Sequence, residues 1–247
     1  MNRVELVTKP IDHLTEGLDE FVPANERHLL VVLPHPDDES FAAGGTMARC
    51  ADANVPVTFL CGTYGDMGRR MGSPFFATRE SMRDVRVSEL REACRVLGAT
   101  PRWLGLRDRT VEFEDPHDVA ARIRDHLDEL SPSTVITFFP GHAVHPDHDA
   151  LGHATHLAVR TWAGGRPNLL AVAVGDRADI RAKLGPPHVY CDVRSVVERK
   201  LGALAAHRSQ TEMMFQRWER GDEDDEQTRT FREEMLVLER YYRLPLD

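Results

Sequence analysis

The chain contains the apolar stretch His28-Leu29-Leu30-Val31-Val32-Leu33-Pro34, followed directly by His35-Pro36-Asp37-Asp38-Glu39. The apolar run is short and rich in Val and Leu, so it predicts a strand of a parallel sheet that is buried on both faces. A helix is expected next, over residues 40–49. A histidine and three acids therefore lie where a strand ends and a helix begins, which is the edge of an open α/β sheet at which ligands bind.

The rest of the chain repeats this alternation of strand and helix. Further strands are expected over residues 55–61, 102–106, 134–139, 169–174 and 188–191. Helices are expected over residues 79–97, 116–130, 146–162, 193–207 and 227–242, and Gly98 is expected to cap the C-terminus of the first of them. Alternation of this kind predicts an α/β fold with a parallel sheet and helices on both faces.

Length and composition bound the class of protein. The 247 residues are 41% hydrophobic and 29% charged, which is typical of a globular protein with one large core. We expect an N-terminal arm over residues 1–27 and a single domain over residues 28–247, since no linker or internal repeat divides the chain. The first nine residues lack the pattern of a signal peptide, and no run is apolar enough to span a membrane.

Charge and cysteine usage narrow the partners and the compartment. A net charge of −9 argues against duplex nucleic acid as a partner, because phosphates are bound by basic faces. It does not argue against a small anion held by a few arginines. The four cysteines, at positions 50, 61, 94 and 191, form no CxxC pair. We therefore expect reduced, mostly buried thiols in a cytoplasmic protein.

Two loops at the carboxyl ends of strands carry the residues of a metal site. His35 and Asp38 come from the turn after the first strand, and His148 belongs to the helix entry His145-Pro146-Asp147-His148 after another strand. Two histidines and one carboxylate are a common ligand set for a catalytic zinc, with a fourth position open for water. Both loops lie on the same edge of a parallel sheet, so we expect them to meet.

Two neighbours of these ligands suit hydrolysis. A zinc-bound water has a pKa of about 7, and Asp37 lies next to Asp38, where a carboxylate can act as general base. His145 is available to face the oxyanion that develops on the substrate. Each acid by itself also has a structural interpretation, since Asp37 and Glu39 suit the first turn of a helix and Asp147 suits a helix cap. The joint pattern of the two loops favours the metal site.

Other polar residues carry weaker signals. His142 follows the same strand as His145 and can line the pocket, whereas His153 and His156 are expected to pack or to face solvent. The acidic run at residues 221–226 is expected to be a solvated loop between two helices. Glycines 62, 65 and 68 suit an anion-binding nest but lack G-x-G-x-x-G spacing, so a nicotinamide dinucleotide is not expected.

The motif Pro34-His35-Pro36-Asp37-Asp38-Glu39 together with His145-Pro146-Asp147-His148 resembles the LmbE/PIG-L family of metal-dependent N-deacetylases. Further matches at Arg86-Val87-Ser88-Glu89 and between Lys200 and Gln210 extend the resemblance over most of residues 28–212. The resemblance implies a Rossmann-like three-layer sandwich with a mostly parallel sheet. It implies zinc ligands at His35, Asp38 and His148, a general base at Asp37 and a transition-state stabiliser at His145.

Within the family, residues 61–69, 104–108, 140–142 and 206–211 resemble the branch that deacetylates N-acetylglucosaminyl malate in bacillithiol biosynthesis. The implied substrate is therefore a small amino-sugar conjugate. Arg86 matches an arginine associated with substrate carboxylates, and a guanidinium binds a carboxylate in a fork. Arg69, Asp108 and His142 lie in the matching stretches and are expected to contact the substrate.

One position departs from the family pattern. Val144 stands where some relatives carry an arginine, immediately before the first histidine of His145-Pro146-Asp147-His148. The way in which malate is held is therefore open, and Arg69, Arg70 or Arg107 can compensate.

Several alternatives stay open from the sequence. The same ligands suit zinc and ferrous iron. The substrate can be another N-acetylglucosamine conjugate, such as a mycothiol-type precursor or a chitooligosaccharide, or an S-conjugate cleaved by an amidase. A non-haem Fe(II) oxygenase shares the ligand set and would consume oxygen, and a non-catalytic sugar- or metal-binding module would release no acetate. Family relatives form trimers or hexamers, so a homo-oligomer is expected.

Overall fold

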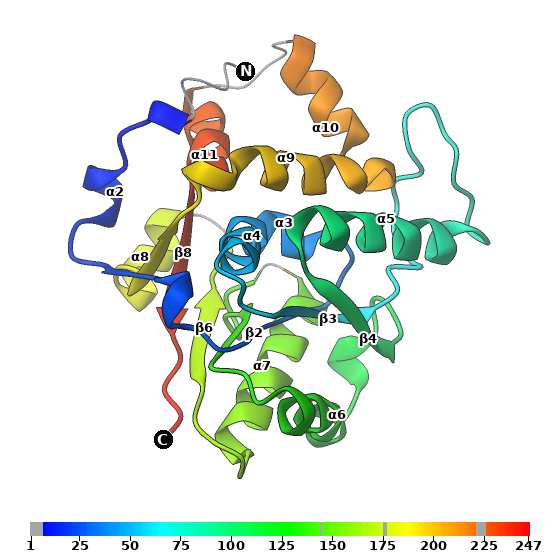
Figure 1. The fold of residues 1–247 in the computed structure, drawn as a ribbon. Coiled ribbons are helices and arrows are strands. Elements are labelled where there is room, and N and C mark those ends of the chain that lie inside the picture. The colour runs from blue at the N-terminus through cyan, green and yellow to red at the C-terminus, as the bar shows by residue number, and fades with distance from the viewer. Residues whose placement is uncertain (1–6, 144, 175–176, 221–225) are drawn as a thin grey trace.

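A computed structural model describes residues 7–143, 145–174, 177–220 and 226–247 (Figure 1). Among these residues, eight strands form one sheet in the order β1-β7-β8-β6-β5-β2-β3-β4. Neighbouring strands are parallel except where β8 pairs with β6 and β7, so the mostly parallel sheet is confirmed. The strands are β1 (Asp19–Glu20), β2 (Leu29–Leu33), β3 (Val57–Thr63), β4 (Thr100–Leu106), β5 (Thr134–Phe138), β6 (Asn168–Val172), β7 (Val189–Asp192) and β8 (Leu238–Arg243).

Helices cover both faces of the sheet, which confirms the three-layer sandwich. On one face lie α3 (Asp38–Ala42), α4 (Gly44–Asp52), α5 (Met82–Leu97) and α9 (Val197–Ala206), and on the other lie α6 (Pro116–Leu130) and α7 (Pro146–Thr161) (Figure 1). Short 3-10 turns occupy residues 23–25, 111–113 and 194–196. The remaining helices are α2 (Asp12–Thr15), α8 (Arg177–Leu184), α10 (Arg208–Arg220) and α11 (Glu226–Val237).

The central strand β2 shows why its sequence is a continuous apolar run. Leu29, Val31 and Leu33 belong to the apolar cluster that includes residues of α4 and α5, whereas Leu30 and Val32 belong to the cluster with residues of α6 and α7. All five side chains are fully buried. Burial of each such side chain contributes about 1.5–3 kcal/mol to folding. Both faces of the strand must therefore be apolar.

The position of β2 in the sheet decides where a site can form. Val31 pairs with Phe59 of β3 on one side and with Ile136 of β5 on the other. The chain leaves β2 toward β3 in one direction and returns to add β5 on the opposite side, so a crevice lies outside the carboxyl ends of β2 and β5. The turn after β2 and the loop after β5 therefore emerge side by side.

The prediction of a single helix over residues 40–49 is wrong, because the segment is divided into two helices, α3 and α4. Ala43 has φ −146° and interrupts the helical backbone. The N–H groups of Gly45 and Thr46 then donate to the carboxylate of Glu239 in β8, each at 2.8 Å. The start of α4 is thus capped by an acid almost 200 positions away, which no local pattern indicates.

The prediction of a C-terminal helix over residues 227–242 is also wrong beyond Val237, where the helix α11 ends. Leu238–Arg243 forms β8, which inserts between β6 and β7 as an antiparallel strand. Tyr241 and Tyr242 suit a strand, but the pairing partners lie about 50 to 70 positions earlier in the chain. Helices α8 and α10 were not expected, and the predicted N-terminal arm contributes β1, which pairs with β7.

Other expectations have mixed outcomes. Gly98 caps α5 in the left-handed conformation, at φ 78°, and all four cysteines are free and buried, as predicted. Val144 lies outside the described residues, and of the acidic run at 221–226 only Glu226 lies within them, at the start of α11.

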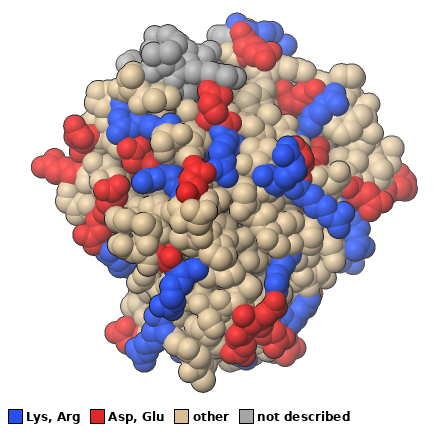
Figure 2. Space-filling model, in the orientation of Figure 1, with Lys and Arg blue, Asp and Glu red and all other residues tan. Residues whose placement is uncertain are grey.

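In the parts of the chain that the structure describes, no helix has the length and apolarity to cross a bilayer. Figure 2 shows a face on which basic and acidic side chains are interspersed.

Close packing at Gly45 leads to a prediction about stability. A Cβ atom at this position would lie 2.4 Å from Cβ of Val193. We expect Gly45→Ala to lower the free energy of unfolding by about 1–3 kcal/mol, because the fully buried Val193 must shift. Urea denaturation measures the change. Gly44→Ala is the matched control, since its nearest contact would be 3.4 Å away; equal destabilisation by both changes would contradict the packing argument.

Candidate active site

The turn after β2 and the start of α7 bring the three predicted metal ligands together. Nδ1 of His35 lies 3.1 Å from Nε2 of His148 and 3.4 Å from Oδ2 of Asp38. Nε2 of His148 lies 3.5 Å from Oδ1 of Asp38. His35 and Asp38 are each only 9% exposed. The two loops that the sequence singled out therefore meet.

The spacing of these atoms fits a tetrahedral metal ion. Ligand atoms at about 2.0–2.1 Å from a zinc ion are about 3.3–3.4 Å apart along the edges of a tetrahedron. Nδ1 of His35 makes two separations close to that value, 3.1 Å to Nε2 of His148 and 3.4 Å to Oδ2 of Asp38, and Nε2 of His148 lies 3.5 Å from the other oxygen of Asp38, Oδ1. His35, Asp38 and His148 can therefore hold one metal ion and leave a fourth position open.

Hydrogen bonds behind the two histidines orient their lone pairs toward this point. Nε2 of His35 donates to Oδ2 of Asp147 at 3.1 Å and lies 3.3 Å from Oδ1 of Asp108. Nδ1 of His148 donates to the carbonyl of Ala143 at 3.0 Å. The remaining nitrogens, Nδ1 of His35 and Nε2 of His148, are left as acceptors that face each other. Outer carboxylates and carbonyls of this kind commonly fix metal-binding histidines.

The charges around His35, Asp38 and His148 favour a cation between these side chains. Burial lowers the pKa of His35, but its hydrogen bonds to Asp108, Asp147 and Asp38 outweigh that effect and raise the pKa well above its usual value. Burial likewise raises the pKa of Asp38, but His148 and His35 lower it to about 2. Asp38 is therefore ionised, and the carboxylates around His35 stabilise positive charge, which either a proton or a metal ion can supply.

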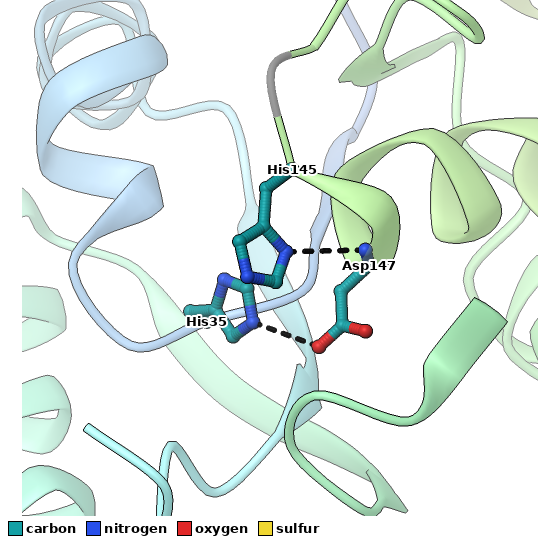
Figure 3. Close-up of side chains that lie close together, drawn as sticks. All are labelled: His35, His145 and Asp147. Atoms are coloured by element: carbon teal, nitrogen blue, oxygen red, sulfur yellow. Dashed lines mark hydrogen bonds and ion pairs between the residues drawn. The ribbon is translucent and has the colours of Figure 1, made fainter. Parts of the chain in front are cut away.

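A second group of possible ligands consists of His35, His145 and Asp147 (Figure 3). In it, Asp147 is fully buried and its oxygens already accept the N–H groups of Arg109 at 2.7 Å and Val111 at 3.1 Å. Nδ1 of His145 accepts the N–H of Asp147 at 3.1 Å. Because these atoms are engaged, this group supports the ring of His35 and is a poorer metal site than the first.

The contacts of Asp147 lead to a prediction about metal affinity. We expect Asp147→Asn to weaken metal binding by about 10- to 100-fold, because an amide cannot accept hydrogen bonds through both of its terminal atoms. Competition with a chromophoric chelator measures the affinity. Asp149→Asn on the same helix serves as the control, since Oδ1 of Asp149 makes no hydrogen bond within the described residues. An unchanged affinity in Asp147→Asn would show that His35 keeps its orientation without this carboxylate.

Asp37, the predicted general base, has an unusual backbone and a charged neighbour. Its φ of 122° is outside the regions that residues with a side chain normally adopt. One oxygen, Oδ2, lies 3.1 Å from Nη2 of Arg86, and the side chain is 20% exposed. Burial raises the pKa of Asp37, with a further rise from Asp38, and these effects outweigh the lowering by Arg86. The carboxylate thus lies beside Asp38 but is held from the side of α5.

Arg86, predicted to bind a substrate carboxylate, is engaged by the protein itself. It is 4% exposed, donates from Nη1 to the carbonyl of Gly65 at 3.2 Å, and donates from Nη2 to the carbonyl of Pro36. Together with its ion pair to Asp37, these contacts occupy both terminal nitrogens. Substrate binding by Arg86 stays a prediction, and the observed contacts give the side chain a role in holding Asp37.

The other predicted substrate contacts lie at different depths. Asp108 is 3% exposed and accepts the N–H of Met67 at 2.8 Å, so it lies behind His35 and away from solvent. His142 is half-buried and lines a cavity of about 500 Å³ together with His145. Arg69 is exposed on the loop after β3. Contact of these three residues with the substrate stays a prediction.

His145, the predicted transition-state stabiliser, is a neutral donor in this structure. Because its Nδ1 accepts the N–H of Asp147, the ring proton belongs on Nε2. Burial and the neighbouring His35 lower the pKa of His145, which also favours the neutral ring. An imidazole in this state still offers Nε2–H to an oxyanion, so protonation of the ring is not required.

A large apolar cavity adjoins the metal ligands, and the sequence did not indicate it. Its volume is about 590 Å³, and Asp38 and His148 form part of its wall. The remaining wall comes from α3, β5, β6, the chain before β7, α8, α10, α11 and β8. Two of these helices, α8 and α10, were not expected from the sequence. Apolar side chains of this wall include Phe41, Phe138, Val172, Ile180, Met214, Trp218, Met235, Leu238 and Tyr242.

Proteins of known name share this fold. N,N'-diacetylchitobiose deacetylase of Pyrococcus horikoshii superposes with a TM-score of 0.68 at 20% identity, covering 98% of this chain and 90% of that one. GalB, a 4-carboxy-2-hydroxymuconate hydratase of Pseudomonas putida KT2440, superposes with a TM-score of 0.65 at 19% identity, covering 89% and 96%. Since a deacetylase and a hydratase share the fold, these likenesses establish the architecture and not the reaction.

Sequence comparisons identify the family. The family model PIG-L, described as GlcNAc-PI de-N-acetylase, matches residues 30–159, which include His35, Asp37, Asp38, His145 and His148. A protein of Bacillus anthracis named "Probable N-acetyl-alpha-D-glucosaminyl L-malate deacetylase 2" is 49% identical over 188 residues, covering 75% of this chain and 82% of that protein. The family model spans more than half of the chain, so this protein belongs to the PIG-L family of de-N-acetylases.

Proposed function

We propose that the protein hydrolyses the N-acetyl group of N-acetylglucosaminyl malate, releasing acetate and glucosaminyl malate. The observation that carries the proposal is that His35, Asp38 and His148 form a possible metal-binding group, with Asp37 close enough for Asp38 and His35 to act on its pKa and with His145 near the same group. The name of the relative from Bacillus anthracis supports the choice of substrate.

We propose zinc as the resident metal, held by His35, Asp38 and His148. A metal bound there supplies a water of lowered pKa and polarises the amide carbonyl. Three protein ligands, two histidines and one carboxylate, are a common set for a catalytic zinc, whereas ferrous iron usually has more open positions. Metal analysis of protein purified without added metal distinguishes the two.

The protein's own residues carry the proton transfers. The carboxylate of Asp37 takes a proton from the attacking water and later delivers it to the leaving amine, because an amide leaves poorly unless its nitrogen is protonated. Nε2–H of His145 donates a hydrogen bond to the oxygen on which negative charge develops. Arg86 fixes the carboxylate of Asp37 through its ion pair at 3.1 Å.

Malate adds two carboxylates to the sugar, and three arginines at the rim of the site suit them. Arg69, Arg107 and Arg109 are exposed on the loops after β3 and β4. Within the described residues, none of these guanidinium groups has a hydrogen-bond or ion-pair partner. The backbone N–H of Arg109 binds Asp147, and its positive charge lowers the pKa of His145, which places the side chain near the reacting groups. Such arginines can take the place of the family arginine that position 144 lacks.

Acetate release from N-acetylglucosaminyl malate and from free N-acetylglucosamine tests the proposal. We expect zinc-loaded protein to cleave the malate conjugate much faster. Equal cleavage of both compounds would support deacetylation but contradict a specific recognition of malate. No acetate from either compound, with metal bound, would contradict the proposed reaction.

The rim arginines lead to a prediction about specificity. We expect Arg109→Met to raise KM for the malate conjugate about 10-fold, equivalent to about 1.4 kcal/mol, with little change in kcat. Steady-state kinetics measure both constants, and free N-acetylglucosamine is the control because it has no carboxylates. If KM for both compounds rises equally, Arg109 contacts the sugar or shapes its loop, and another group binds malate.

A second candidate function follows from the apolar cavity beside Asp38 and His148. Its wall suits an apolar substituent, which N-acetylglucosaminyl malate lacks, so an amidase that cleaves an S-conjugate of the amino sugar is the alternative. Comparing hydrolysis of a conjugate that carries an aromatic thioether with hydrolysis of the malate compound decides between them. A homo-oligomer of three or six chains stays a prediction, which light scattering coupled to size-exclusion chromatography tests.

A further inference from the structure

The backbone of Asp37 must be held by its surroundings. Its φ of 122° and ψ of −30° lie in a region that a residue with a Cβ atom rarely adopts. An adjacent residue, Asp38, is a metal ligand whose own position depends on this turn. A strained conformation at a reacting residue persists only where several contacts determine it.

Glu39 provides one of these contacts. Its Oε2 accepts the backbone N–H of Asp37 at 3.0 Å, and its side chain is fully buried. The other oxygen, Oε1, accepts the hydroxyl of Ser40 at 2.6 Å. A buried carboxylate needs further hydrogen bonds or a charged partner.

His207 is that partner, and it comes from a distant part of the chain. Its Nε2 lies 2.5 Å from Oε1 of Glu39, and both side chains are fully buried. His207 stands at the junction of α9 and α10, where its carbonyl accepts the N–H groups of Gln210 at 2.8 Å and Thr211 at 2.9 Å. The carboxylate of Glu39 thus connects His207, at the junction of two helices, to the backbone N–H of Asp37.

We propose that Glu39 and His207 are positioning residues for the general base. His207 orients Glu39, Glu39 holds the backbone N–H of Asp37, and Arg86 holds the carboxylate of the same residue. The inference rests on the proposed role of Asp37. Neither residue is among the metal-binding groups or lines the cavity beside Asp38 and His148, so each acts through Asp37 and not on the substrate.

The test compares three variants of the zinc-loaded protein. His207→Leu removes the donor to Glu39, whereas His207→Gln keeps an N–H donor of similar reach. Lys200→Met is the matched control, because Lys200 forms an equally buried ion pair with Glu239, and that pair does not contact Asp37. For each variant, kcat, KM, metal content, melting temperature and hydrogen exchange of the Asp37 amide are measured.

We expect His207→Leu to lower kcat about 10²-fold, since a misplaced catalytic group costs about that much, with KM and metal content nearly unchanged. The Asp37 amide should exchange faster. His207→Gln should restore most of kcat and the slow exchange. Lys200→Met should lower the melting temperature while its folded form keeps kcat and the slow exchange. If His207→Leu does not fold, Glu39→Gln replaces it. The single amide oxygen of glutamine cannot accept hydrogen bonds from both His207 and the backbone N–H of Asp37.

Three results would overturn the inference. A folded, metal-loaded His207→Leu protein with normal kcat and normal exchange would show that Glu39 holds Asp37 unaided. Loss of metal in parallel with kcat would make His207 a support of the metal site. An equal loss of kcat in Lys200→Met would make the effect one of general stability. The exchange measurement needs no substrate, so it tests the positioning even if the wild-type protein releases no acetate and the proposed function fails.

Discussion

Replacing Asp37 by alanine is expected to lower kcat about 10²- to 10⁴-fold, the range that loss of a general base costs. In the proposed mechanism this carboxylate takes a proton from water and returns it to the leaving amine, and its side chain is 20% exposed. Metal content should stay near that of the wild type, because the ligand atoms belong to other residues. Steady-state kinetics with metal analysis on the same sample measure both quantities.

Two further variants sharpen this result. Asp37→Asn keeps the shape of the side chain and its contact with Arg86 but removes the base, so it should be nearly as inactive as Asp37→Ala. Asp84→Ala is the control, since Asp84 is an exposed acid in the first turn of α5. Near-normal turnover in Asp37→Asn would assign the proton transfers to another group.

Replacing His148 by alanine is expected to remove metal and activity together. Two ligands remain in that variant, His35 and Asp38, and an open two-ligand site binds zinc weakly. The loss of affinity should exceed the ~10- to 100-fold that loss of an outer hydrogen-bond partner costs. Metal per chain after dialysis and acetate release are measured side by side, and added zinc should restore activity only in part.

The control for this change is His153→Ala, on the same helix and exposed. It should keep both metal and turnover. If His148→Ala retained a full equivalent of metal, the ion would be held by the second group, His35, His145 and Asp147, and the assignment of ligands would change. Activity lost without metal loss would instead give His148 a role toward the substrate.

The architecture explains why these residues lie close together. Ligands from the turn after β2 and from the start of α7 converge because β2 and β5 are neighbours in the sheet. A hydratase shares this fold, so the fold by itself does not decide the reaction. The reaction therefore depends on which side chains the two loops carry, and here they carry Asp37, the proposed base, and a possible metal-binding group.

Local patterns were sufficient for much of this protein. The apolar run of β2 predicted a strand buried on both faces, and α6 has the predicted bounds, Pro116–Leu130, because Pro132 and the apolar spacing are local signals. The motifs at residues 35–39 and 145–148 were enough to select His35, Asp38 and His148, since both follow strands of one parallel sheet. These features depend on neighbours a few positions apart.

Other features depend on contacts between remote segments, which only the tertiary structure decides. β8 is a strand because it pairs with β6 and β7, and α4 begins at Gly44 because Glu239 caps it. Arg86 turns toward Asp37, and His207 reaches Glu39 across 168 positions of sequence. A buried carboxylate needs a charged or hydrogen-bonding partner, and the packing of the helices decides which residue lies close enough. The spacing of residues along the chain does not predict that partner.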